Sequence, residues 1–128
     1  MDDADLKGIP LFEGLASAEL LKIAAWLEPI EVPAGWYLLN QGSSPVGFFV
    51  VVEGRVDVDR EGAVIATLGP GDFFGEIALL EGDRRTATVI TATQVRALVM
   101  DADEFFRMCA EIPEVKTRIN AAALERGD

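Results

Sequence analysis

The chain has 128 residues, enough for one compact domain and too few for two ordinary ones. Half of the residues are hydrophobic, so a core can be buried, and the net charge of −11 argues against nucleic acid or an anionic membrane as partners, because both require clustered cations. The absence of histidine removes the commonest general base and metal ligand, and Cys109 alone can form neither an intramolecular disulfide nor a cysteine-based metal cluster.

The beginning of the chain is expected to be helical. Residues 1–14 are predicted to contain a short helix that ends near Gly8, and Ser17 is expected to cap a second helix that runs to about Leu27. The acidic start of the sequence is unlike a signal peptide, and the longest apolar run is too short to span a bilayer, so we expect a cytoplasmic domain. The apolar residues predicted to share one face of the second helix are Leu20, Leu21, Ala24 and Leu27.

Residues 30–100 have the pattern of strands and turns. Short runs rich in Val, Ile, Phe and Trp are separated by turn-forming sequences such as those at residues 42–45 and 69–72. Val56 and Val58 alternate with charged neighbours, as in a half-buried strand. Turn signals roughly every 8–12 residues favour a sandwich or barrel over a βαβ fold.

Two helices are predicted after the strands. Asp101 and Glu104 have the spacing of a capping box, and Pro113 suits the first position of the final helix. The residues that fall on one stripe of that final helix are Val115, Ile119, Ala122 and Arg126.

The candidate binding chemistry lies between residues 71 and 89. Gly75 would let the backbone approach a bound group closely, and the N–H groups of Ile77 and Ala78 at the start of a short helical turn would attract an anion. Arg85, just before the next strand, can direct planar guanidinium donors at the same place. These groups predict a small-anion site.

Glu76 lies beside this anion site. Its carboxylate would repel an anion, so it is useful only if it contacts a hydroxyl of the same ligand; an anion and a nearby hydroxyl describe a sugar phosphate. The segment resembles the phosphate-binding cassette of cyclic-nucleotide-binding domains, the family that includes the catabolite activator protein, cyclic-nucleotide-dependent kinases and cyclic-nucleotide-gated channels. The matching residues are Phe74-Gly75-Glu76-Ile77-Ala78-Leu79 and Arg85-Thr86-Ala87-Thr88-Val89.

The resemblance implies a role for each cassette residue. Arg85 would pair with the cyclic phosphate, and the backbone N–H groups near Ile77, Ala78 and Ala87 would complete the cradle. Glu76 would accept a hydrogen bond from the ribose 2′-hydroxyl. The ligand-binding set is therefore expected to contain no catalytic group and no metal ligand.

Further ligand contacts follow from the same resemblance. Thr86 would add a hydroxyl at the phosphate. A threonine at this position is compatible with cyclic GMP, but it also occurs in relatives that prefer cyclic AMP, so it does not identify the ligand. Val58, Ile65 and Ala66 match positions that line the purine in relatives, and they suit a protein core equally well. Arg126 matches a lid over the purine and is equally consistent with a solvated helix charge.

The resemblance implies one cyclic-nucleotide-binding domain over residues 1–128. It would have a helical N-terminus (1–28), an antiparallel β-roll or jelly-roll (29–100) that includes the cassette (74–89), and C-terminal helices (101–126). The fold class is therefore mainly β with flanking helices (α+β).

The function implied is that of a regulatory module for cyclic AMP and cyclic GMP, with no cofactor and no catalysis. Ligand binding would shift the final helix about a hinge at Phe105–Pro113 and close Arg126 and Ile119 over the base. The tail, Ile112–Val115 and Ala123–Arg126, resembles bacterial cyclic-nucleotide-gated potassium channels, which implies a place in a tetrameric membrane channel. An isolated domain is expected to be monomeric and to make no direct membrane contact.

Three alternatives remain open. The fold could be a degenerate cyclic-nucleotide domain that docks proteins, although the cassette keeps both Glu76 and Arg85. It could be the sensor part of a catabolite-activator-type transcription factor without its DNA-binding domain. A cupin-like enzyme is disfavoured because its metal site needs histidine.

Overall fold

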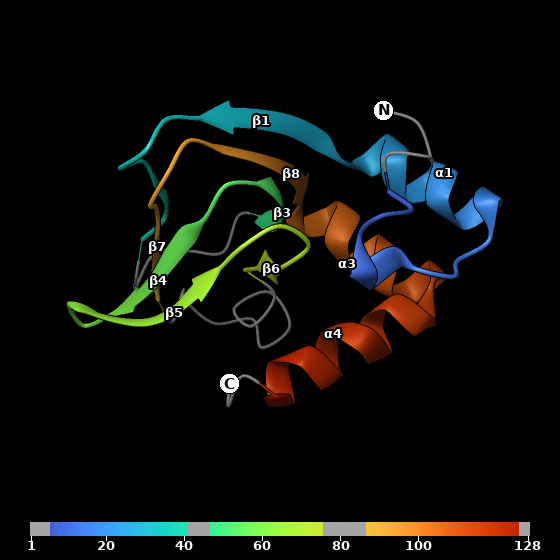
Figure 1. The fold of residues 1–128 in the computed structure, drawn as a ribbon. Helices are drawn as coiled ribbons and strands as arrows, with labels where there is room; N and C mark the ends of the chain where they lie inside the picture. Colours follow the sequence, from blue (N-terminus) through green and yellow to red (C-terminus); the bar gives the residue numbers. More distant parts are fainter. Residues whose placement is uncertain (1–5, 41–46, 76–86, 126–128) are drawn as a thin grey trace.

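The computed structural model describes residues 6–40, 47–75 and 87–125. Two antiparallel sheets form a β-roll, and the helices gather at one end of it (Figure 1). The strand orders are β1-β8-β3-β6 and β2-β7-β4-β5. This confirms the expected β-roll with flanking helices.

The strands are β1 (Glu28–Val32), β2 (Tyr37–Leu39), β3 (Gly47–Glu53), β4 (Val56–Arg60), β5 (Ala63–Leu68), β6 (Phe73–Phe74), β7 (Thr88–Thr91) and β8 (Val95–Asp101). The helices are the 3-10 turn η2 (Pro10–Phe12) and the α-helices α1 (Ser17–Trp26), α3 (Ala102–Glu111) and α4 (Pro113–Glu125). Of the short helix predicted to end near Gly8, residues 1–5 lie outside the described residues, and residues 6–8 form a turn.

Helix α1 differs from its prediction in two details. Its N-cap is Ala16 rather than Ser17, and the Glu19 carboxylate accepts a hydrogen bond of 3.1 Å from the Ala16 N–H. Leu21, predicted on the buried face, is 56% exposed, whereas Ile23 is fully buried. Because successive helical residues are about 100° apart, the stripe that includes Ile23 turns Leu21 towards solvent.

Strand β3 is buried on both faces and separates two apolar cores. Its alternate side chains point in opposite directions. Phe48 and Val50 enter the core beneath the helices, while Phe49 and Val51 enter the core between the sheets. In the helical core, the ring centroids of Phe48 and Phe105 lie 5.0 Å apart. This strand therefore fixes the helices against the roll.

The C-terminal helices begin where the sequence predicts. The Glu104 N–H donates to Asp101 Oδ1 at 2.8 Å, and the Asp101 N–H donates to Glu104 Oε1 at 3.1 Å, so the capping box is confirmed. Helix α4 begins at Pro113, and Val115 and Ile119 of the predicted stripe are fully buried. None of the helices in the described part of the chain is long and apolar enough to cross a membrane.

Candidate functional site

The segment with the binding motif passes from one sheet to the other. Strand β6 ends at Phe74 in the first sheet, and β7 begins at Thr88 in the second. Gly75 opens the segment with a φ of 95°, in the region that favours glycine, and Ala87 closes it. The predicted ligand-binding residues that lie outside the described residues are Glu76, Ile77, Ala78, Arg85, Thr86 and Arg126.

Thr91 fixes the far end of β7, the strand that follows the motif. Its side chain is 2% exposed, and Oγ1 donates to the Pro33 carbonyl at 2.6 Å and accepts from the Trp36 N–H at 2.8 Å. A buried hydroxyl with both a donor and an acceptor partner is well satisfied. Sequence analysis offers no signal for this role of Thr91, because threonine is an ordinary strand residue.

The three predicted base contacts lie together on β4 and β5. Val58 pairs in register with Val89 of β7 on one side and with Ala66 of β5 on the other. The register then shifts, so that Asp59 faces Val64 and Ile65 has no opposite partner. Val58 packs against the core between the sheets, whereas Ile65 is 50% exposed. The bulge therefore leaves an apolar side chain open beside a partly buried apolar row.

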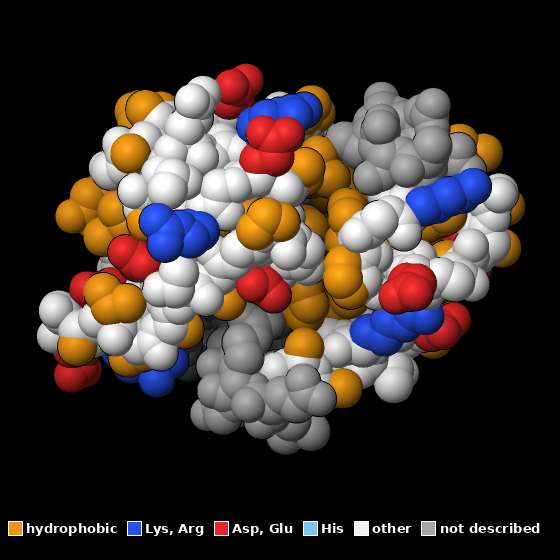
Figure 2. Space-filling view, in the orientation of Figure 1, with side chains coloured by type: hydrophobic (Ala, Val, Ile, Leu, Met, Phe, Trp, Pro, Cys, Tyr) orange, Lys and Arg blue, Asp and Glu red, His pale blue; other side chains and the backbone are white. Residues whose placement is uncertain are grey.

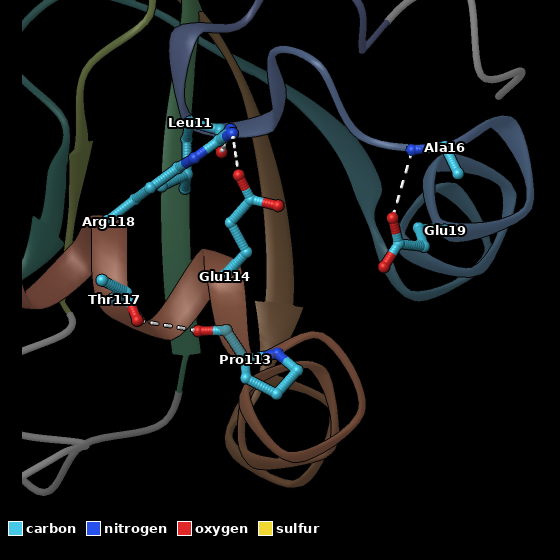
Figure 3. Close-up of polar contacts among 7 residues, drawn as sticks. All are labelled: Leu11, Ala16, Glu19, Pro113, Glu114, Thr117 and Arg118. Carbon is cyan, nitrogen blue, oxygen red and sulfur yellow. Dashed lines mark hydrogen bonds and ion pairs between the residues drawn. The ribbon is translucent and has the colours of Figure 1, made fainter.

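Arg118 ties helix α4 to the beginning of the chain (Figure 3). Its Nη1 donates to the Leu11 carbonyl at 2.9 Å, and its Nη2 pairs with Glu114 Oε1 at 2.7 Å. Within the same helix, Thr117 Oγ1 donates to the Pro113 carbonyl at 3.2 Å. Sequence analysis can recognise the Glu114–Arg118 pair, because the two residues are four apart in one helix. It cannot recognise the bond from Arg118 to Leu11, because 107 residues separate them.

The segment predicted as a hinge, Phe105–Pro113, is helical except at one residue. Helix α3 ends at Glu111 and α4 begins at Pro113, so Ile112 is the junction. Phe105, the other end of the predicted hinge, is fully buried in the helical core. Ile119 is also a core residue here, so a place above a bound base would require α4 to move.

We expect Arg118→Met to destabilise the fold by about 1 kcal/mol, because it leaves the partly buried Leu11 carbonyl without its donor. Urea unfolding measures the difference. Glu114→Gln is the matched control: it removes only the ion pair to a carboxylate side chain that is 61% exposed and should cost about 0.5 kcal/mol or less. Equal losses in the two variants would contradict a stabilising bond to Leu11.

The described residues offer little reactive chemistry. Burial raises the pKa of the Cys109 thiol, an effect that the nearby positive charge of Lys116 partly opposes, so the sulfur is a poor nucleophile at neutral pH. Within residues 6–40, 47–75 and 87–125, no three His, Cys, Asp or Glu side chains are placed to hold a metal ion. What these residues supply is an apolar row on β4 and β5 beside β7, the strand that follows the predicted anion-binding segment in the sequence.

Comparison with known proteins gives a consistent result. Residues 29–112 match the family model described as the cyclic nucleotide-binding domain. A cyclic nucleotide-gated potassium channel of Rhizobium etli is 42% identical over 118 residues, which are 92% of this chain and 33% of the channel. The chain thus spans about a third of the length of this curated relative.

Solved structures share the fold. The regulatory domain of Toxoplasma gondii protein kinase A with cyclic AMP superimposes with a TM-score of 0.85 at 26% identity, covering 96% of this chain and 48% of that one. The Thermus thermophilus catabolite activator protein gives a TM-score of 0.81 at 27% identity, covering 91% of this chain and 57% of that one.

Proposed function

The chain belongs to the cyclic nucleotide-binding domain family, and from this premise we propose that it is a non-catalytic regulatory module that binds cyclic AMP and also cyclic GMP. The observation that carries the proposal is the match over residues 29–112, which takes in the whole segment between β6 and β7. The apolar row on β4 and β5 beside β7 supports it, since a purine needs an apolar surface next to its phosphate site.

In this proposal each group of the ligand has its own partner. Arg85 neutralises the cyclic phosphate with a planar fork of donors, and the N–H groups at Ile77, Ala78 and Ala87 add further hydrogen bonds. Glu76 accepts from the ribose 2′-hydroxyl, which disfavours deoxyribose. The base rests against the exposed bulge residue of β5 and its apolar neighbours.

The base and the phosphate offer further contacts. Thr86 adds a hydroxyl at the phosphate. This hydroxyl is compatible with a guanine base as well as with an adenine base, so both cyclic nucleotides bind. Val58, Ile65 and Ala66 supply the apolar wall, and the bulge makes Ile65 the most accessible of the three. No step in this scheme breaks a bond of the ligand.

The signal is a shift in the position of α4. A ligand can drive such a shift only by the difference between its affinities for the two states. Ile112, the single residue between α3 and α4, is where the chain would turn, and Arg126 would close over the base. The Arg118 bond to Leu11 belongs to the state described here and opposes that movement.

The larger context is proposed from the same relatives. We place the domain on the cytoplasmic side of a tetrameric potassium channel, with an isolated domain that is monomeric. A second candidate is the sensor half of a transcription factor, which the likeness to the catabolite activator protein favours. A DNA mobility-shift assay on the 128-residue chain should show no binding under either candidate, because its net charge is −11.

Titration calorimetry with cyclic AMP, cyclic GMP and AMP tests the proposal. We expect saturable one-site binding of both cyclic nucleotides and at least about ten-fold weaker binding of AMP, whose extra charge and open phosphate fit the cradle poorly. Near-equal affinities for the cyclic forms would assign Thr86 a permissive role. No heat with any nucleotide, on protein that unfolds cooperatively, would favour the docking-domain alternative.

A further inference from the structure

A hollow of about 310 Å³ lies between the end of α1 and the beginning of α3, and none of its lining residues belongs to the cassette. Glu28 and Val99 pair in register across β1 and β8, so the two strands meet here. Asp101 and Glu104 stand at the N-terminal end of α3. The residues that line it, here called the Trp26 hollow, are Ala25, Trp26, Glu28, Val99, Asp101 and Glu104.

The hollow is acidic, with three carboxylates among its lining residues. In the described ranges, no Lys or Arg forms an ion pair with any of its three carboxylates. Lys22, one helical turn before Trp26, is engaged instead with Glu111 at 3.2 Å. Asp101 and Glu104 each accept the capping-box hydrogen bond with one carboxylate oxygen, which leaves the second oxygen of each outside the capping box. The site therefore attracts positive charge, and the net charge of −11 adds to the attraction.

The spacing of these groups favours an organic cation over a metal ion. No three acidic side chains among the described residues converge closely enough to hold a metal. Trp26 contributes a half-buried indole ring, packed against the helical core, to the wall of the hollow. An aromatic face with surrounding carboxylates is the arrangement that binds guanidinium and ammonium groups.

An apolar contact lies one turn away on the same helix. Leu21 and Ala25 are four residues apart, so they share one stripe of α1, and Ala25 forms part of the wall of the hollow. Leu21 is 56% exposed, although leucine is usually buried. Figure 2 shows that hydrophobic side chains reach the surface in several separate places on the face it presents, among acidic and basic groups, so exposure alone would not mark a site. What distinguishes Leu21 is that it lies one helical turn from Ala25, a residue that lines the acidic hollow.

We infer that the Trp26 hollow is a docking site for a basic amphipathic helix of a partner polypeptide. An arginine of the partner enters the hollow between Trp26 and the carboxylates of Glu28 and Glu104. A leucine four residues away on the same partner helix packs on Leu21. The charge complementarity selects the partner, and the apolar contact fixes its direction. This site is separate from the proposed nucleotide site and does not depend on it.

Tryptophan fluorescence tests the proposal directly. The chain has two tryptophans, so Trp36→Phe leaves Trp26 as the sole reporter. The probe is a blocked, Ala-rich helical peptide of about 17 residues with one Arg and one Leu four residues apart. We expect a saturable change in Trp26 emission that weakens as salt is added. The same peptide with citrulline for arginine should bind at least about ten-fold more weakly.

A charge-matched pair of variants locates the contact. Glu28→Lys places a cation in the hollow and should weaken peptide binding at least about ten-fold. Glu31→Lys changes the net charge equally on the same strand, outside the hollow, and should weaken it less than about three-fold. Equal losses, equal binding of the citrulline peptide, or half-saturation by arginine amide at the same concentration as the peptide would overturn the proposal. So would the absence of any saturable change at low salt.

Discussion

Arg85→Gln should weaken cyclic AMP binding by about 10²–10³-fold, the largest functional effect we expect from any single substitution. Loss of a charge-assisted, bidentate hydrogen bond to a phosphate that has left water costs several kcal/mol, and each tenfold in affinity corresponds to about 1.4 kcal/mol. Glutamine keeps much of the length and polarity of arginine while removing its charge. Calorimetric titration of both proteins with cyclic AMP measures the change.

The neighbouring arginine provides the control. Arg84 directly precedes Arg85 in the sequence, and Arg84→Gln changes the net charge from −11 to −12, just as Arg85→Gln does. If Arg84 acts only through the general field, its replacement should cost less than about three-fold. Comparable losses in the two variants would contradict the specific pairing of Arg85 with the phosphate. Unchanged affinity in Arg85→Gln would remove the assigned site altogether.

Phe105→Ala should lower the free energy of unfolding by about 3–5 kcal/mol. Phe105 is fully buried in the helical core, and its ring centroid lies 5.0 Å from that of Phe48, the β3 residue on which α3 rests. Truncation leaves a cavity between the helix and the roll. Since small domains are stable by only about 5–15 kcal/mol, this change removes a large part of the total.

The adjacent residue has the same chemistry and a different environment. Phe106 is 47% exposed, so Phe106→Ala should cost about 1 kcal/mol or less. Urea unfolding measures the free energy of unfolding of both variants. If Phe105→Ala does not fold, Phe105→Leu replaces it, with an expected loss of about 1–2 kcal/mol in the free energy of unfolding. A loss in Phe106→Ala as large as that in Phe105→Ala would contradict the assignment of α3's buried face.

Features that depend on near neighbours in the chain can be predicted from the amino-acid sequence. The capping box of Asp101 and Glu104, and the start of α4 at Pro113, need only residues within one helical turn. The alternation of Val56 and Val58 identified β4, because a strand has a period of two. The proposed binding motif can be recognised for the same reason: its residues are close together in the chain, and their types suit the chemistry of a sugar phosphate.

Contacts between distant parts of the chain become visible only in the folded structure. Leu21 and Ile23 are both apolar and lie in one helix, and their different burial depends on where the rest of the core lies. The bulge beside Ile65 follows from the register between β4 and β5, which side-chain pattern alone left open.

The polar contacts that fix the helices and β7 were decided in the same way. Arg118 bonds to a carbonyl at Leu11, and Thr91 bonds to the turn at Pro33 and Trp36. These partners become neighbours only in the folded roll. In addition, every residue has a backbone carbonyl, so the residue type at Leu11 or Pro33 does not indicate which carbonyl accepts the bond. Local patterns therefore specified the elements and the motif, while long-range packing chose the anchors, the open face of α1 and the hollow beside Trp26.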